Sequence, residues 1–335
     1  MATYIGIKGG EIQTIAGDPA NPIVGQVWYN TTANTLKSYG LQGAGAWATG
    51  GDVNTGRVYS SGAGTQTAAL FISGDANPVT YFLGCESYDG TSWTEGPDVN
   101  TGKKNVTGGM GTSTACIDTA AQTTAGYVPA IAEEWNGTSW TEIGDLNTGR
   151  SYAASATNGT PTACQIAGGG STAASHVPGV ETEQYNGTAW TEVGNLNFGR
   201  WRPSGMGTNT AALAVGDANA PEEDKTEAWD GTSWTAVADI NGGGYCMAGA
   251  GSQTTAFVNG GNPAVKRHSG GNSKTEQFNG TSWTEVADMT GALACSGAAG
   301  NSDTSLVFSG DLSASTPLLT YAYSLTDATK TFTSS

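Results

Sequence analysis

The sequence predicts an all-β protein built from one unit that recurs every 44 to 50 residues. One six-residue motif (aromatic, Asn or Asp, Gly, Thr, Ser or Ala, Trp) occurs five times. The chain has 51 glycines and only 13% charged residues, a composition typical of turn-rich β proteins. No stretch shows the 3.6-residue apolar period of an amphipathic helix. The copies span residues 88–93, 135–140, 185–190, 229–234 and 278–283.

Each copy of the motif predicts a β-hairpin. Asn-Gly or Asp-Gly between strand residues is a strong hairpin signal, because a type I′ turn needs positive φ at both central positions. We therefore expect the motif to form the last two strands of each unit, joined by a type I′ turn. Its Trp is expected to be a packing residue.

Conserved spacing within the chain defines the rest of the unit. A cation follows the motif Trp, or its equivalent Trp47, by ten residues in the first four units, whereas Gly244 and Leu293 take that position in the last two. A polar turn with glycine lies between Trp and cation and links one unit to the next. The aligned tryptophans are Trp47, Trp93, Trp140, Trp190, Trp234 and Trp283, and the cations are Arg57, Lys103, Arg150 and Arg200.

Two further strands fill each unit. A segment of small residues, such as 60–64, predicts a strand where space is tight, because no bulky sequence would fit there. A continuous apolar run, such as 70–72, predicts a strand buried on both faces. Each unit therefore has four strands.

The order of these features resembles the kelch repeat over residues 45–324. The apolar run leads into Gly-Gly at 168–169 and 260–261, then come a variable loop, the aromatic, the Gly turn, the Trp and the cation. The resemblance implies a β-propeller of kelch-like four-stranded blades. It implies no particular function, because propellers host many.

Strand counting predicts six blades in a closed ring. The sixth unit departs from the pattern, since no Gly-Thr-Ser-Trp follows Tyr323. The missing outer strand is expected from residues 46–49, whose Ala-Trp-Ala-Thr is similar to the Ser-Trp-Thr-Glu of other copies. Pairing of the N-terminal and C-terminal strands would then close the ring and remove an exposed sheet edge.

The chain ends lie outside the repeat. Residues 1–44 are expected to form a small extended segment with a hairpin around 30–34, and residues 325–335 a C-terminal tail. Residues 22–37 are similar to a segment that recurs in tail and fibre proteins of tailed bacteriophages. That resemblance implies that residues 1–44 dock the protein to a virus particle.

Charge and composition exclude several functions. The 13 Lys and Arg against 29 Asp and Glu give a net charge of −16, which disfavours nucleic acid and anionic membranes. No signal peptide or membrane span is expected. Five scattered cysteines and two histidines predict no disulfide framework, zinc site or other cofactor, and the cysteines are expected to be small buried hydrophobes.

A glutamate stands two residues before the hairpin aromatic in five units: Glu86, Glu133, Glu183, Glu227 and Glu276. One interpretation is a ring of carboxylates for a metal or substrate. The other is a set of structural pairs with the repeated cations, which the regular repetition favours.

The loops between the second and third strands vary in length and would gather on one face, where propellers usually bind ligands. Aromatic and charged residues there suit recognition of a glycan or protein, although solvated loops would look the same. The candidate binding residues are Tyr81, Phe82, Tyr127, His176, Glu222, Glu223, Asp224, Lys266, Arg267 and His268.

The sequence thus predicts a non-enzymatic virion tail or fibre component, made in the host cytoplasm. It would present the loop face to a host-surface glycan or protein, as one of several copies in an oligomer. The first alternative is a structural virion accessory that binds only other virion subunits. The second, less favoured, is an oxidase or glycan-active enzyme on a kelch scaffold, for which His176 and His268 would lie in different loops.

Overall fold

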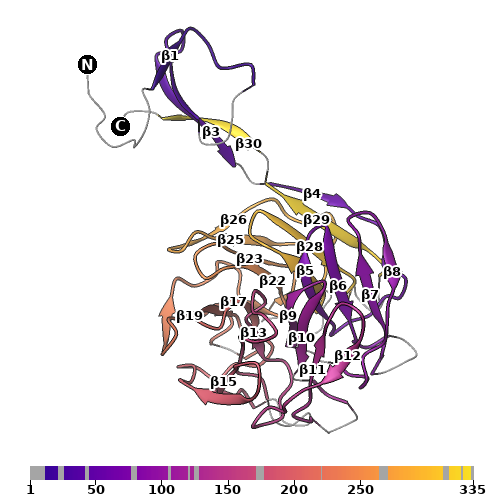
Figure 1. The fold of residues 1–335 in the computed structure, drawn as a ribbon. Helices are drawn as coiled ribbons and strands as arrows, with labels where there is room; N and C mark the ends of the chain where they lie inside the picture. The colour runs from indigo at the N-terminus through magenta and orange to yellow at the C-terminus, as the bar shows by residue number, and fades with distance from the viewer. Residues whose placement is uncertain are drawn as a thin grey trace. The chain divides into compact units, whose positions relative to one another are not determined.

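The computed structural model divides into two compact parts, which we call the terminal domain (Met1–Ala46 and Ser324–Ser335) and the repeat domain (Trp47–Tyr323) (Figure 1). The structure describes residues 12–21, 26–41, 45–76, 81–104, 107–119, 121–123, 128–170, 177–219, 221–263, 271–311, 317–325 and 327–332. These ranges contain strands and turns and no helix that could cross a membrane.

The terminal domain is a four-stranded sheet with strand order β1-β2-β3-β30. Its strands are β1 (Gln13–Ile15), β2 (Val27–Asn30), β3 (Thr35–Leu41) and β30 (Asp327–Phe332). Strands β2 and β3 form the expected hairpin, with Asn30 opposite Thr35. The Asp18 carboxylate accepts hydrogen bonds from Trp28 Nε1 at 3.1 Å and Asn30 Nδ2 at 2.7 Å, and binds Lys37 Nζ at 2.7 Å. These contacts fix the hairpin to the segment before it.

The C-terminal residues differ from the expected tail. Residues 327–332 form β30, which pairs antiparallel with β3 from Leu36 opposite Phe332 to Leu41 opposite Asp327. The backbone N–H and C=O groups along the facing edges of β3 and β30 thereby bond to each other and do not stay unpaired at a sheet edge. The chain ends therefore build one sheet together.

The described part of the repeat domain contains six four-stranded sheets, and in the first five the strands follow chain order from innermost to outermost. The first sheet is β5 (Ser61–Thr65), β6 (Ala68–Ile72), β7 (Cys85–Tyr88) and β8 (Trp93–Glu95); the second is β9 (Thr107–Thr112), β10 (Ala115–Thr119), β11 (Ala132–Trp135) and β12 (Trp140–Glu142); the third is β13 (Ala154–Ser155), β14 (Cys164–Ala167), β15 (Thr182–Tyr185) and β16 (Trp190–Val193). The fourth is β17 (Ser204–Thr208), β18 (Ala211–Val215), β19 (Thr226–Trp229) and β20 (Trp234–Val237); the fifth is β22 (Ala248–Gly251), β23 (Ala256–Asn259), β25 (Thr275–Phe278) and β26 (Trp283–Glu285); β21 (Gly244–Tyr245) pairs separately with β24 (Asn262–Pro263).

The last sheet uses a strand from the other end of the repeats. It consists of β27 (Gly297–Gly300), β28 (Thr304–Phe308), β29 (Thr320–Ser324) and then β4 (Ala46–Thr49) as its outermost strand. A backbone bond from Gly50 N to Thr320 O, 2.8 Å long, continues this pairing. The outer strand missing from the sixth unit is thus supplied by residues 46–49, as the sequence predicted.

The hairpins differ from the expected type I′ turns. Tyr88 pairs with Trp93, so the loop has four residues, and among them only Gly90 has positive φ, at 95°. The Asp89 carboxylate accepts hydrogen bonds from the backbone N–H groups of Thr91 and Ser92, at 2.8 and 2.9 Å. The side chain at this position caps the loop, and so only one residue has to adopt positive φ.

The apolar core lies between neighbouring sheets. Trp93 of the first sheet packs edge-on against Phe308 of the last sheet, with ring centroids 4.8 Å apart. Its Nε1 donates to Thr320 Oγ1 at 3.0 Å, and Trp234 makes the same bond to Thr182 Oγ1. The motif tryptophans therefore join one sheet to the next, as expected for packing residues.

Small residues let the innermost strands approach closely. A Cβ added to Gly62 of β5 would lie 2.3 Å from the Ala298 carbonyl oxygen of β27. One added to Gly205 of β17 would lie 2.3 Å from Ser155 N of β13. The Gly- and Ala-rich composition of the first strand of each unit follows from this contact.

Candidate functional site

The repeated glutamates and cations form buried clusters at the linkers between sheets. Arg57 Nη2 lies 3.1 Å from Glu86 Oε1, and the residues are 0% and 1% exposed. The same carboxylate accepts hydrogen bonds from Asn54 N at 2.7 Å and Thr55 N at 3.2 Å. Because Asn54 and Thr55 lie in the linker that enters the first sheet, the glutamate fastens the linker to that sheet.

This arrangement recurs in the next three units. The ion pairs are Lys103–Glu133, Arg150–Glu183 and Arg200–Glu227, all with side chains at most 3% exposed. Lys103 also binds Asp118, at 2.9 Å. The glutamates lie in separate sheets, each satisfied by its own linker. No group of three or more His, Cys, Asp or Glu in the described ranges is arranged to hold a metal ion.

The last two units replace the pair in different ways. Glu276 keeps its linker bonds, from Asn241 N at 2.9 Å and Gly242 N at 2.8 Å, without a cation at Gly244. In the sixth unit Leu293 and Tyr321 occupy the two positions and belong to one apolar cluster. Across the six units the two positions therefore hold an ion pair, a glutamate without a cation, or two apolar residues. This variation fits a structural role.

The five predicted loop residues that the structure describes make contacts within the fold. Tyr81 accepts a hydrogen bond from Gln122 Nε2 at 3.4 Å, and Lys104 Nζ lies 5.0 Å from its ring centroid. Phe82 stacks 5.1 Å from the Arg57 guanidinium. The backbones of Glu223 and Asp224 accept hydrogen bonds from Gly244 N and Ile240 N in the next linker.

Glu222, like Glu223 and Asp224, is half-buried, and its carbonyl accepts from Lys225 N at 3.1 Å. The remaining predicted loop residues, Tyr127, His176, Lys266, Arg267 and His268, lie outside the described residues. Among the loop residues that the structure describes, no predicted ligand site is brought together, although each of them is at least partly accessible.

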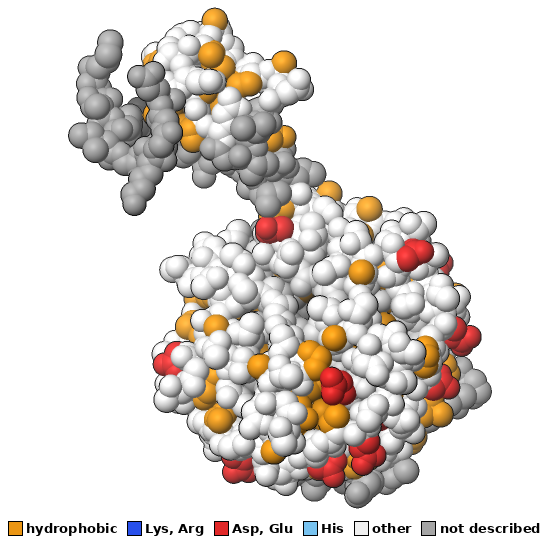
Figure 2. Space-filling model, in the orientation of Figure 1, with side chains coloured by type: hydrophobic (Ala, Val, Ile, Leu, Met, Phe, Trp, Pro, Cys, Tyr) orange, Lys and Arg blue, Asp and Glu red, His pale blue; other side chains and the backbone are white. Residues whose placement is uncertain are grey.

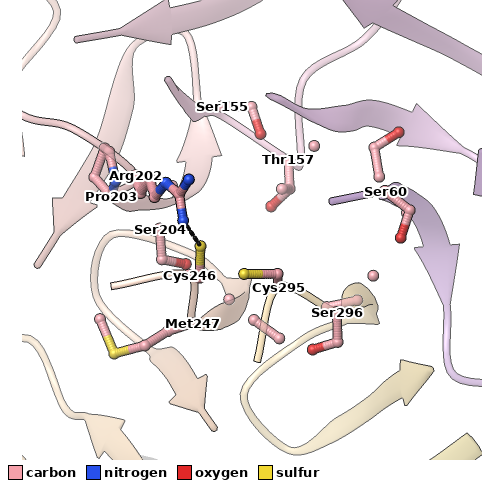
Figure 3. A pocket seen from close by; sticks show the side chains of 18 of the residues that line it. Ser60, Ser155, Thr157, Arg202, Pro203, Ser204, Cys246, Met247, Cys295 and Ser296 are labelled. Carbon is pink, nitrogen blue, oxygen red and sulfur yellow. Dashed lines mark hydrogen bonds between the residues drawn. The ribbon is translucent and has the colours of Figure 1, made fainter. Parts of the chain in front are cut away.

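A polar pocket lies where the innermost strands begin, and we call it the axial pocket (Figure 3). It has a volume of about 100 Å³. Residues at or near the start of each of the six innermost strands line it. Ser61 pairs with Ile72, which precedes the variable loop of its sheet. The axial pocket therefore lies at the same end of the sheets as the variable loops.

Five lining residues occupy one position of the repeat, twelve residues after the aligned Trp. They are Tyr59, Tyr152, Arg202, Cys246 and Cys295, and all have φ between 52° and 64°. Backbone hydrogen bonds of 2.9 to 3.1 Å link them in series, from Arg202 N to Tyr152 O, Cys246 N to Arg202 O, Cys295 N to Cys246 O and Tyr59 N to Cys295 O. Non-glycine residues with positive φ are uncommon and concentrate at functional sites.

Arg202 is the cation of the axial pocket. Its Nη2 donates to Tyr152 Oη at 2.9 Å, and its guanidinium carbon lies 4.2 Å from the Tyr152 ring centroid. Its Nη1 lies 3.9 Å from Cys246 Sγ. Burial opposes the guanidinium charge, but Cys246 and Tyr152 together raise the pKa of Arg202 above its usual value. Arg202 therefore stays protonated and attracts negative charge to the pocket.

The two thiols of the axial pocket differ in acidity. Burial alone would raise the pKa of Cys246, but a hydrogen bond from the Cys295 thiol and the charge of Arg202 lower it below its usual value. Burial and the hydrogen bond to Cys246 raise the pKa of Cys295 well above its usual value. Cys246 is therefore the more acidic of the two thiols.

The sequence interpretation missed the axial pocket, although a signal was present. Aligning the repeats on their tryptophans gives Tyr, Asn, Tyr, Arg, Cys and Cys at the twelfth following residue, a varied set inside an otherwise regular repeat. Cys246 and Cys295 were expected to be buried hydrophobes; Cys295 is buried and Cys246 is half-buried, and both lie in the pocket.

No protein-family model matches this chain, and no curated protein matches it. Among solved structures it is similar to one described as the structure of YjhT, with a TM-score of 0.60 and 9% identity. That match covers 84% of this chain and 96% of the YjhT chain. The four-stranded sheets fit a β-propeller. Each four-stranded sheet of the repeat domain corresponds to one blade of such a fold. The similarity to YjhT concerns the fold alone.

Proposed function

We propose that the repeat domain is a six-bladed propeller of kelch type whose ring is closed by β4. Three contacts support closure. Strand β4 completes the sheet of β27 to β29, Gly62 of β5 faces Ala298 of β27, and Trp93 of the first sheet packs on Phe308 of the last. The first and last sheets thereby meet as neighbouring blades of a ring do.

We propose further that the protein is a virion component of a tailed phage, made in the host cytoplasm, that binds a host-surface glycan or protein without catalysis. The observation that carries this proposal is the division of the chain into two compact parts. The terminal domain contains the hairpin whose sequence is similar to phage tail and fibre proteins. It would dock to the particle and to other virion proteins, leaving the propeller to bind.

The binding face would be the end of the propeller that carries the variable loops and the axial pocket. Loop residues Tyr81 and Glu222 are partly accessible there. Acidic side chains are spread over the face of the repeat domain seen in Figure 2, in keeping with the net charge of −16 and with a partner other than nucleic acid. Several copies in a homo-oligomer would multiply weak single contacts.

Binding of the full-length protein to whole bacteria and to purified envelope polysaccharides tests the proposal. We expect binding that is lost in Tyr81→Ala or Glu222→Ala. It should be kept in Thr188→Ala, an exposed position in a hairpin at the opposite end of a sheet. Absence of binding by the assembled oligomer to every probe would overturn the recognition proposal and favour the structural accessory.

A further inference from the structure

Two of the five cysteines meet in the axial pocket. Cys246 and Cys295 hold the same repeat position in neighbouring units, just before β22 and β27. Cys295 N donates a hydrogen bond to Cys246 O at 2.9 Å, and both residues line the pocket. Figure 3 shows both sulfur atoms in the pocket beside Arg202. The backbone bond brings the two main chains together, as a disulfide requires.

The surroundings give the two thiols different roles. Arg202 Nη1 lies 3.9 Å from Cys246 Sγ, and the pKa of Cys246 is lowered while that of Cys295 is raised. A thiolate next to a guanidinium is the nucleophilic form of cysteine, and a neighbouring protonated thiol can resolve an oxidised intermediate. Tyr59 and Tyr152 act electrostatically on Arg202, and the carboxylate of Asp311 acts on both thiols.

The pocket also has room and polarity for a small reactant. Its volume of about 100 Å³ exceeds that of a few water molecules, and Ser155, Thr157 and Ser296 line it. Arg202 Nε is buried and has no hydrogen-bond partner in the described part of the chain. A buried donor without a partner is costly, so a bound oxygen atom would satisfy it.

We infer that Cys246 and Cys295 form a redox-active dithiol that reduces a small hydroperoxide within the axial pocket. The Cys246 thiolate attacks the terminal peroxide oxygen, so that an S–O bond forms, the O–O bond breaks and an alkoxide or hydroxide leaves and takes up a proton. The Cys295 thiol then attacks the resulting sulfenic acid, forming the disulfide and releasing water. One hydroperoxide gives one disulfide, one alcohol or water, and one further water.

The disulfide would cross-link the segments that enter β22 and β27, the innermost strands of neighbouring sheets. The inference stands apart from host recognition, because it depends only on the pocket. The other three thiols provide internal controls. Burial raises the pKa of Cys85 to about 12, and it also raises the pKa of Cys116 and Cys164.

Titration of the reduced full-length protein with hydrogen peroxide tests the inference. Free thiols are counted under denaturing conditions and the cross-link is located by peptide mass spectrometry. We expect one equivalent of peroxide to remove two thiols and to yield one intramolecular disulfide, between Cys246 and Cys295. Retention of all five thiols, or losses spread over Cys85, Cys116 and Cys164, would overturn the inference.

Variants separate the two roles. Cys295→Ser should accumulate a sulfenic acid at Cys246 that dimedone traps, and Cys246→Ser should lose no thiol. Cys164→Ser, a matched change outside the pocket, should still form the disulfide. Arg202→Met should slow thiol loss, because the guanidinium that favours the Cys246 thiolate is gone. Thermal unfolding of each variant identifies any that misfold, and equal rates in folded Arg202→Met and the unchanged protein would refute the role of Arg202.

Discussion

Replacement of Arg200 by leucine is the most direct test of the buried clusters that fasten the linkers. Arg200 Nη2 lies 3.0 Å from Glu227 Oε1, and its Nη1 donates to the carbonyls of Gly216 and Lys225 at 3.0 and 2.8 Å. Both ionic side chains are 0% exposed. Removing one partner of a buried ion pair costs about 3 to 5 kcal/mol, because the other charge is left uncompensated.

The fifth unit indicates that the cost for Arg200 lies at the lower end of this range of about 3 to 5 kcal/mol. Glu276 is held there by the backbone N–H groups of Asn241 and Gly242 without a cation. Glu227 would keep the corresponding bond from Asn197 N at 2.8 Å. We therefore expect Arg200→Leu to lower the unfolding free energy by about 3 kcal/mol. For a domain of this size the melting temperature should fall by about 6 °C.

Thermal unfolding followed by circular dichroism measures this change. A second substitution, Glu227→Gln, removes the unpaired charge and keeps an acceptor for Asn197 N, so the double variant should regain part of the loss. Lys274→Leu is the control, because its pair with Glu285 is about half exposed and worth at most about 1 kcal/mol. An unchanged melting temperature for Arg200→Leu, or a double variant less stable than the single one, would refute the reasoning.

Two further predictions concern a buried carboxyl and a close strand contact. Burial raises the pKa of Asp217 from 3.8 to about 6, so the folded state binds more protons than the unfolded state between these pH values and stability falls as the pH rises. Asp217→Asn keeps an acceptor for Trp201 N and has no carboxyl to titrate. Its unfolding free energy relative to the unchanged protein should therefore rise by at most about 3 kcal/mol between pH 4 and pH 7. A difference in melting temperature that does not depend on pH would contradict this. Gly62→Ala should cost about 2 kcal/mol, because the new Cβ would lie 2.3 Å from Ala298 O. Gly17→Ala, with no atom within 4 Å of the new Cβ, is its control, and equal melting temperatures for the two variants would count against tight packing of β5 on β27.

Much of the fold could be predicted from the sequence because its signals are local and repeated. The hairpin motif, the small-residue strand and the apolar strand each depend on neighbouring residues, and the five copies of the motif fix their register. The supply of the sixth outer strand by residues 46–49 followed from counting strands. The hairpin turn type was wrong, since the Asp89 side chain supports a four-residue loop that backbone preferences alone do not indicate.

The sequence by itself determined the four-stranded unit and its repetition, and it favoured the pairing of glutamates with cations, because each shows as a fixed spacing along the chain. Only the tertiary structure decided that residues 327–332 form a strand on β3, since that pairing joins segments almost a chain length apart. It also decided that Tyr152, Arg202, Cys246 and Cys295 converge on one pocket. Residues from different repeats become neighbours there only because the sheets gather their innermost strands side by side, and no spacing within one repeat encodes that contact.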